Sequence, residues 1–157
     1  MARQFRDSEI DAIQIIPNAG EQARHRLVRL EGPPELLVVT SALGIFSHSE
    51  LPYVASGVSD REGIGTNGTG FQYDTDELDP DEEPLEGVRI YNVLGEVDMS
   101  RRAFERLMTR YFRAIIENAQ RTQHPVRKEP WWPEFVETVQ KIEERTKLAE
   151  SSREFRG

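Results

Sequence analysis

The stretch from Tyr73 to Glu86 limits the fold more than any other part of the chain, because it cannot be buried. It carries eight carboxylates in fourteen residues and neither Lys nor Arg. Like charges repel, and each ionised carboxylate must stay hydrated or meet a cation. Glycines recur between Ser59 and Gly87, together with two prolines, and these residues disfavour regular structure. We therefore expect an acidic, Gly-rich loop over about residues 59–87, which is either functional or disordered.

On the N-terminal side of this loop, short apolar segments between turn residues predict β-strands. The segment from Ile10 to Ile16 is rich in isoleucine, and Arg24 to Leu30 alternates loosely between polar and apolar residues. Glu35 to Thr40 contains four consecutive aliphatic residues and is expected to be a central strand. Leu51 to Val58 is expected to add a short strand. After the loop, Gly87 to Leu94 resumes the sheet.

The C-terminal part of the chain predicts two amphipathic helices. The first helix is expected to run from Ser100 to about Thr122. Ser100 is a suitable N-cap, and Met99 can pack on Phe104 as a hydrophobic staple. Its apolar residues share one stripe at helical spacing: Phe104, Leu107, Met108, Tyr111, Ile115 and Ala119.

Pro133 fits the first turn of a second helix, which follows a break over residues 123–130. The apolar face of this helix comprises Phe135, Val139, Ile142 and Ala149, and its expected i,i+4 ion pairs are Glu137–Lys141 and Glu143–Lys147. Residues 151–157 are expected to be a frayed tail. The predicted fold is a single α+β domain over residues 1–157, in which four or five antiparallel or mixed strands carry the two C-terminal helices on one face.

Charge and composition restrict the function. The 157 residues have a formal net charge of −8 and no cysteine, so disulfides, thiolate metal sites and thiol nucleophiles are excluded. The segment from Gly57 to Asp98 contains twelve acidic residues and two arginines, whereas the segment from Met99 to Lys128 contains eight basic residues and two acidic ones. No apolar run reaches the roughly 18 residues that span a bilayer, and the first residues lack the apolar core of a signal peptide. We expect a cytoplasmic protein without a membrane partner.

Familiar site motifs fit the sequence poorly. Gly63-Ile-Gly-Thr-Asn-Gly68 matches the spacing of the dinucleotide fingerprint, but the acids that follow would repel phosphates, so we interpret it as a flexible loop. Asp74-x-Asp76 begins like a calcium-binding EF-hand loop, but Leu78 stands at a ligand position and the required glycine is missing. An ordered EF-hand is therefore excluded, whereas a loose, weak cation site is not. The main interpretations are a solvated acidic loop and a docking surface for a basic partner.

The remaining polar residues favour structural roles. Four arginines, Arg102, Arg106, Arg110 and Arg113, line one flank of the first helix; pairing with the nearby acidic loop, or simple solvation, is favoured over nucleic-acid binding. The histidines at 25, 48 and 124 show no metal-ligand spacing and are expected at the surface. No catalytic, cofactor-binding or metal-binding set stands out. Of the adjacent Trp131 and Trp132, one is expected in the core and the other partly exposed.

One segment resembles small bacterial immunity proteins, particularly those that accompany contact-dependent growth-inhibition toxins. The resemblance covers about thirty residues and lies in a strand, a Gly-Glu turn and an amphipathic helix: Val88-Arg-Ile-Tyr91, Gly95-Glu-Val-Asp-Met-Ser100, Phe104, Leu107-Met108 and Tyr111-Phe112. It implies a protein that binds a cognate toxin domain in the cytoplasm and blocks its active site without chemistry of its own.

The leading hypothesis is therefore a non-enzymatic immunity protein that neutralises a basic toxin domain, such as a nuclease. An acidic surface can occupy a basic phosphate-binding cleft with fast, steered association. The expected partner-binding residues are Tyr73, Asp74, Asp76, Glu77, Asp79, Asp81, Glu82, Glu83 and Trp131. A regulatory or scaffold module is the first alternative, and a small carboxylate-dependent hydrolase is the second.

Overall fold

The helix α5 (Arg101–Arg121) is the centre of the fold, and it lies where the sequence predicts it. The computed structural model describes residues 3–77, 80–82 and 84–156, and for residues 151–156 the backbone alone. The Ser100 side chain accepts a hydrogen bond from the Ala103 backbone amide at 3.0 Å, which confirms the predicted N-cap. The whole predicted apolar stripe of α5 is buried, so this helix is part of the core.

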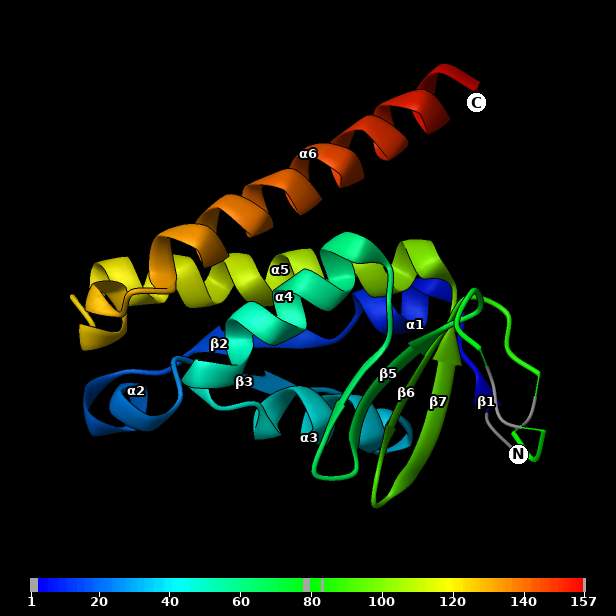
Figure 1. The fold of residues 1–157 in the computed structure, drawn as a ribbon, viewed down its shortest axis with the longest axis horizontal. Helices are drawn as coiled ribbons and strands as arrows, with labels where there is room; N and C mark the ends of the chain where they lie inside the picture. The colour runs from blue at the N-terminus through cyan, green and yellow to red at the C-terminus, as the bar shows by residue number, and fades with distance from the viewer. Residues whose placement is uncertain (1–2, 78–79, 83, 157) are drawn as a thin grey trace.

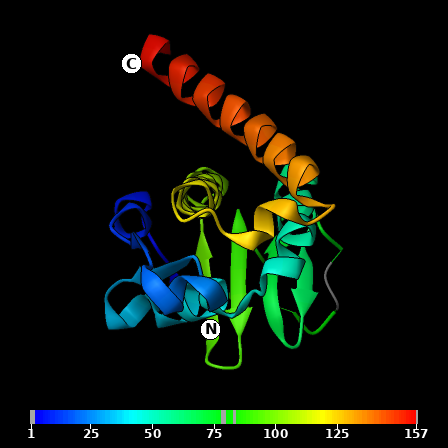
Figure 2. The ribbon, with the colours of Figure 1, turned by 90° about the vertical axis from the view of Figure 1, so that its left-hand side faces the viewer.

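A five-stranded mixed sheet packs against α5, in the order β1-β7-β6-β5-β4. Its strands are β1 (Arg3–Gln4), β4 (Ile64–Thr66), β5 (Thr69–Tyr73), β6 (Val88–Asn92) and β7 (Gly95–Met99). β1 pairs in parallel with β7, and the other neighbours are antiparallel. Phe71, Ile90 and Val97 lie opposite one another across three strands and are buried. Figure 2 shows α5 end-on above these strands.

The N-terminal third contains short helices and a separate two-stranded sheet. In chain order these are α1 (Asp7–Asp11), β2 (Gln14–Pro17), α2 (Gly20–His25) and β3 (Val28–Glu31), and β2 pairs antiparallel with β3. Two of the strands expected from the sequence are therefore shorter than predicted, because α1 and α2 take the first residues of those segments. α1 and β2 lie along α5.

The final helix, α6 (Trp132–Arg156), crosses α4 (Leu51–Asp60) and α5 (Figure 1). Phe135, Val139 and Ile142 are buried as expected, but Ala149 is exposed and lies outside the apolar face. The helix continues through Arg156, over the stretch for which the sequence favoured a frayed tail, and Gly157 lies outside the described residues. The predicted fold class, α+β with two C-terminal helices on one face of a mixed sheet, is confirmed.

The predicted central strand over Glu35 to Thr40 is wrong. This segment forms a 3₁₀ turn (Pro34–Leu36) and then the helix α3 (Leu37–Ile45). Val39, Ala42 and Leu43 are buried at helical spacing. A short apolar run does not distinguish a buried strand from a buried helix, and Pro34 at the first position of the turn fits a helix start better than a sheet.

The short strand expected over Leu51 to Val58 is also wrong, because this segment is the helix α4. Its buried residues Leu51, Val54, Ala55 and Val58 follow the i, i+3, i+4, i+7 pattern of a helix. Pro52 lies in its first turn. The helix ends at Asp60 and is capped by Arg61, which adopts a left-handed conformation with φ of 54°.

Part of the Gly-rich segment is regular, contrary to the prediction. β4 and β5 form a hairpin in which Thr66 pairs with Thr69. Asn67 and Gly68 make its two-residue turn with φ of 51° and 78°, the conformation that Asn-Gly pairs favour. The glycine motif that resembles a nucleotide fingerprint is therefore a hairpin and has no helix beneath it. Likewise, the turn expected at Gly95-Glu96 is the beginning of strand β7.

Candidate protein-interaction surface

Asp74 fastens both ends of the acidic loop, residues 74–86, to each other and to α5. Its backbone amide donates to the Gly87 carbonyl at 2.9 Å, and its carboxylate accepts from the Gly87 amide at 3.0 Å. The other carboxylate oxygen accepts from Arg101 at 2.6 Å. The hydrogen bond from Gly87 and then that from Arg101 hold the pKa of Asp74 below its ordinary value. This carboxylate therefore closes the loop and is not free for a partner.

Asp76 also has a structural role. Its carboxylate accepts from the backbone amides of Gly63, at 3.0 Å, and Tyr73, at 2.6 Å. A Cβ atom at Gly63 would lie only 2.7 Å from the carboxylate and 2.7 Å from the Phe71 carbonyl oxygen. The glycine is therefore needed at this position because the acidic loop approaches the backbone so closely.

The middle of the loop lies on the outer face of the sheet, which is the face opposite α5. Gln72 donates to Glu82 at 3.1 Å, and Arg89 donates to the Pro84 carbonyl at 3.3 Å. Arg89 is buried and makes a two-point ion pair with Asp98 at 2.7 and 2.9 Å. Its guanidinium also lies 3.7 Å from Glu96. Arg89 thus joins the loop to the two strands beneath it.

Two of the predicted contact residues lie in the wrong place for a shared surface. Tyr73 is completely buried, and its ring packs on Phe104 with centroids 5.6 Å apart; it belongs to the core because alternation along β5 turns it toward α5. Trp131 is half-buried and Trp132 is in the core, as the sequence suggested. The Trp131 segment and the acidic loop, however, lie at opposite ends of the long axis (Figure 1).

Among the described residues, the outward charge of the loop comes from a different set than the sequence proposed. Glu77 and Asp81 are exposed, and Glu86, which was not in the predicted set, is exposed as well. Within residues 3–77, 80–82 and 84–150, no ion pair reaches any of the three. Asp79 and Glu83 lie outside the described residues. On the described surface, Glu77, Asp81 and Glu86 are therefore exposed without an ion pair, whereas Glu82 accepts from Gln72 and Glu96 lies near Arg89.

The arginines on the flank of α5 are paired within the molecule, as expected, but not with the acidic loop. Arg102 contacts Asp7 of α1 at 3.5 Å and Glu150 of α6 at 2.9 Å. Arg106 pairs with Asp11 at 2.8 Å. In addition, Arg113 pairs with Glu143 of α6, and Arg110 donates to the Ile13 and Ile10 carbonyls at 2.9 and 3.4 Å. The prediction that the loop neutralises this flank is wrong, because α1 and α6 lie closer.

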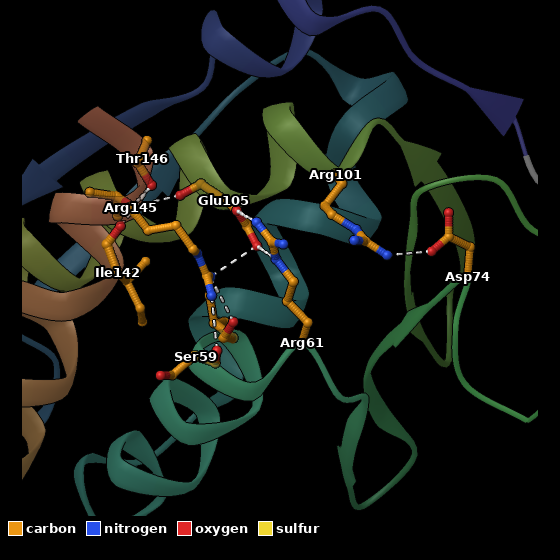
Figure 3. A network of polar contacts seen from close by, with 10 residues as sticks. Ser59, Arg61, Asp74, Arg101, Glu105, Ile142, Arg145 and Thr146 are labelled. Carbon is orange, nitrogen blue, oxygen red and sulfur yellow. Dashed lines mark hydrogen bonds and ion pairs between the residues drawn. The ribbon is translucent and has the colours of Figure 1, made fainter. Parts of the chain in front are cut away.

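A second set of paired arginines holds α4, α5 and α6 together (Figure 3). Buried Glu105 accepts from Arg61 at 2.8 and 3.2 Å and from Arg145 at 2.9 Å. Arg145 also donates to the Ser59 and Val58 carbonyls, at 2.9 and 3.0 Å, at the end of α4. The network fixes the first turns of α5, from which Arg101 reaches Asp74 (Figure 3).

Sequence reasoning missed this network, although α5 contains one indication of it. Glu105 stands three residues before Met108 and seven before Phe112, so helical spacing turns it toward the buried face. Its partners lie 44 and 40 residues away along the chain. No local pattern predicts such distant pairs.

His48 and His124, expected to be separate surface residues, meet in the structure. Their rings are 5.1 Å apart and nearly perpendicular. Nε2 of His48 is buried and has no hydrogen-bond partner within the described part of the chain. Burial, followed by the proximity of His124 and Arg26, lowers the pKa of His48. The imidazole is therefore held in its neutral form at neutral pH.

Comparison with protein families, with curated proteins and with solved structures finds no match to this chain. Over the described residues, no three His, Asp or Glu side chains gather closely enough to hold a metal ion. In the same part of the chain, every helix is too short or too polar to cross a membrane.

Proposed function

We propose that this chain is a non-enzymatic inhibitor of the immunity-protein type, which binds a basic protein domain through its acidic loop. The observation that carries the proposal is that Glu77, Asp81 and Glu86 are exposed and meet no cation among the described residues, on a loop fastened by internal hydrogen bonds. A toxin nuclease is the kind of partner that this surface fits, because its active-site cleft must attract phosphates and is therefore basic.

Two physical effects support this function. Clustered charge of one sign accelerates encounter with an oppositely charged partner. The fastening of the loop by Asp74, Asp76 and Glu82 lowers the entropy lost on binding, because these described parts of the loop are already positioned. The carboxylates that hold the loop in place are different from those that are exposed to solvent. One loop can therefore be both ordered and negatively charged on its surface.

The test is co-expression with the product of the adjacent gene, followed by binding and inhibition measurements on the purified proteins. The triple variant E77Q/D81N/E86Q should lower the association rate about tenfold or more and flatten its salt dependence. Stoichiometric addition of the wild-type chain should abolish the partner's activity.

The matched control is E117Q/E134Q/E144Q, which removes the same charge from exposed positions on α5 and α6. It should leave the association rate close to that of the wild type. Equal effects of the two triple variants would show that only total charge matters, and the proposed docking surface would then be wrong. Absence of any complex with a basic neighbour would remove the proposal itself.

A further inference from the structure

The turn between β6 and β7 presents apolar side chains to solvent. Val93 is 87% exposed and Leu94 is 57% exposed. Leu37, in the first turn of α3 beside this hairpin, is 54% exposed. Tight turns usually carry Gly, Asn, Asp or Ser, so the local backbone does not explain two consecutive aliphatic residues here.

The buried side chain of Asn92 holds this hairpin tip in place. Its carbonyl oxygen accepts from the Leu94 amide at 2.8 Å, which fixes the turn. Its amide nitrogen donates to the Ser41 hydroxyl at 2.7 Å and to the Val38 carbonyl at 3.3 Å, both in α3. The hydrogen bonds of Asn92 therefore fix the position of the exposed tip relative to α3.

The tip is continuous with the acidic surface. Glu96 follows the turn on β7 and lies opposite Tyr91 on β6. Arg89 contacts both Glu96, at 3.7 Å, and the Pro84 carbonyl of the acidic loop, at 3.3 Å. Glu35, two residues before Leu37 in the chain, is exposed just before α3. An exposed carboxylate thus lies two residues from Leu37 and another two residues from Leu94, and Glu96 connects the tip to the loop through Arg89.

We propose that Leu37, Val93 and Leu94 are the apolar anchor of the docking surface and enter an apolar hollow on the basic partner. This inference rests on the proposed function. The acidic loop accelerates the encounter with the partner, and the three apolar side chains slow the dissociation of the complex. Binding energy in protein interfaces concentrates in a few desolvated anchors surrounded by polar residues. A second copy of the chain is a poorer occupant, because its own exposed Glu35 and Glu96 would add like charge to the interface and each chain has a net charge of −8.

The double variant V93S/L94S tests the anchor against the same purified, basic product of the adjacent gene. Affinity should fall about 30-fold, mostly through faster dissociation, with the salt dependence of association unchanged. The control is Leu148→Ser, which makes the same change at a 70% exposed leucine on α6 and should leave the affinity unchanged. Circular dichroism and thermal melts of the free variants would verify that both are folded, as the exposure of these side chains predicts.

The other outcomes are distinct. If V93S/L94S binds like the wild type while E77Q/D81N/E86Q associates slowly, the anchor is wrong and the proposed function stands. If neither variant changes binding, or the partner does not bind at all, both proposals fail. Light scattering of the free protein completes the test: a wild-type dimer that V93S/L94S converts to a monomer would show that a second copy occupies the tip, and would overturn the inference.

Discussion

The arginine flank of α5 and the acidic loop each gather charge of one sign in the sequence, but their surroundings in the structure differ. Arg102, Arg106 and Arg113 each meet a carboxylate from α1 or α6. Glu77 and Asp81 of the loop are exposed and have no such partner among the described residues. The flank is therefore largely neutralised by its own molecule, whereas the loop retains charge for another.

The difference shows that a run of charge indicates a binding surface only if the fold brings no opposite charge to it. The neutralising carboxylates of the flank come from residues that are distant in sequence, such as Asp7 and Glu150. The loop meets Arg101 and Arg89, but these cations engage Asp74 and Asp98, respectively. The comparison predicts that removing paired charges costs stability and that removing outward charges does not.

The largest effect is expected for Glu105→Gln, which removes the most buried carboxylate of the paired set. Arg61 and Arg145 would lose their shared counter-charge, and breaking a buried ion pair in this way costs about 3 kcal/mol of unfolding free energy. Urea denaturation of both proteins measures the change. Glu117→Gln, at an exposed position of the same helix, should change stability by less than about 0.5 kcal/mol. Similar values for the two variants would mean that water already solvates the network.

A smaller difference in unfolding free energy is expected between a substitution in the arginine flank and substitutions in the loop. Arg113→Gln breaks a partly exposed pair with Glu143 and should cost about 0.5–1 kcal/mol. E77Q/D81N/E86Q should cost nothing measurable, because it removes mutual repulsion and no contact in the described structure. Chemical denaturation at low and high salt compares them. A loss of stability in the loop variant larger than that of Arg113→Gln would contradict the proposed division between paired and outward charges.

The last prediction concerns the pH dependence of stability and its origin in His48. Its pKa lies below the ordinary 6.5 in the folded protein, so the unfolded chain binds more protons in the interval between the two values. The contribution of His48 to the unfolding free energy should therefore be fully present above pH 6.5 and should decrease as the pH falls toward the pKa of His48 in the folded protein. Unfolding free energies from about pH 7.5 to about pH 5 should show a flatter profile for His48→Gln. His25→Gln, at an exposed site, is the control, and an equal flattening there would reject the assignment to His48.

Much of the C-terminal half can be predicted from sequence because its signals are long and local. The stripe of α5, its Ser100 cap and the placing of Pro133 in the first turn of α6 all follow from helical spacing and end preferences. The N-terminal half was harder to predict, since the apolar runs that became α3 and α4 are short enough to fit either a strand or a helix. The β4–β5 hairpin had a recognisable Asn67-Gly68 turn, which the surrounding glycines and acids obscured.

The sequence by itself determined that this chain has an acidic surface loop, because eight clustered carboxylates cannot be buried together without partners. It also determined the two long helices. Only the tertiary structure decided which charges face outward: Asp74 and Asp76 fasten the loop, Tyr73 enters the core, and α1 and α6 neutralise the arginine flank. The reason is that the free energy of an ion depends on groups within a few ångströms of it, and these groups come from distant parts of the chain.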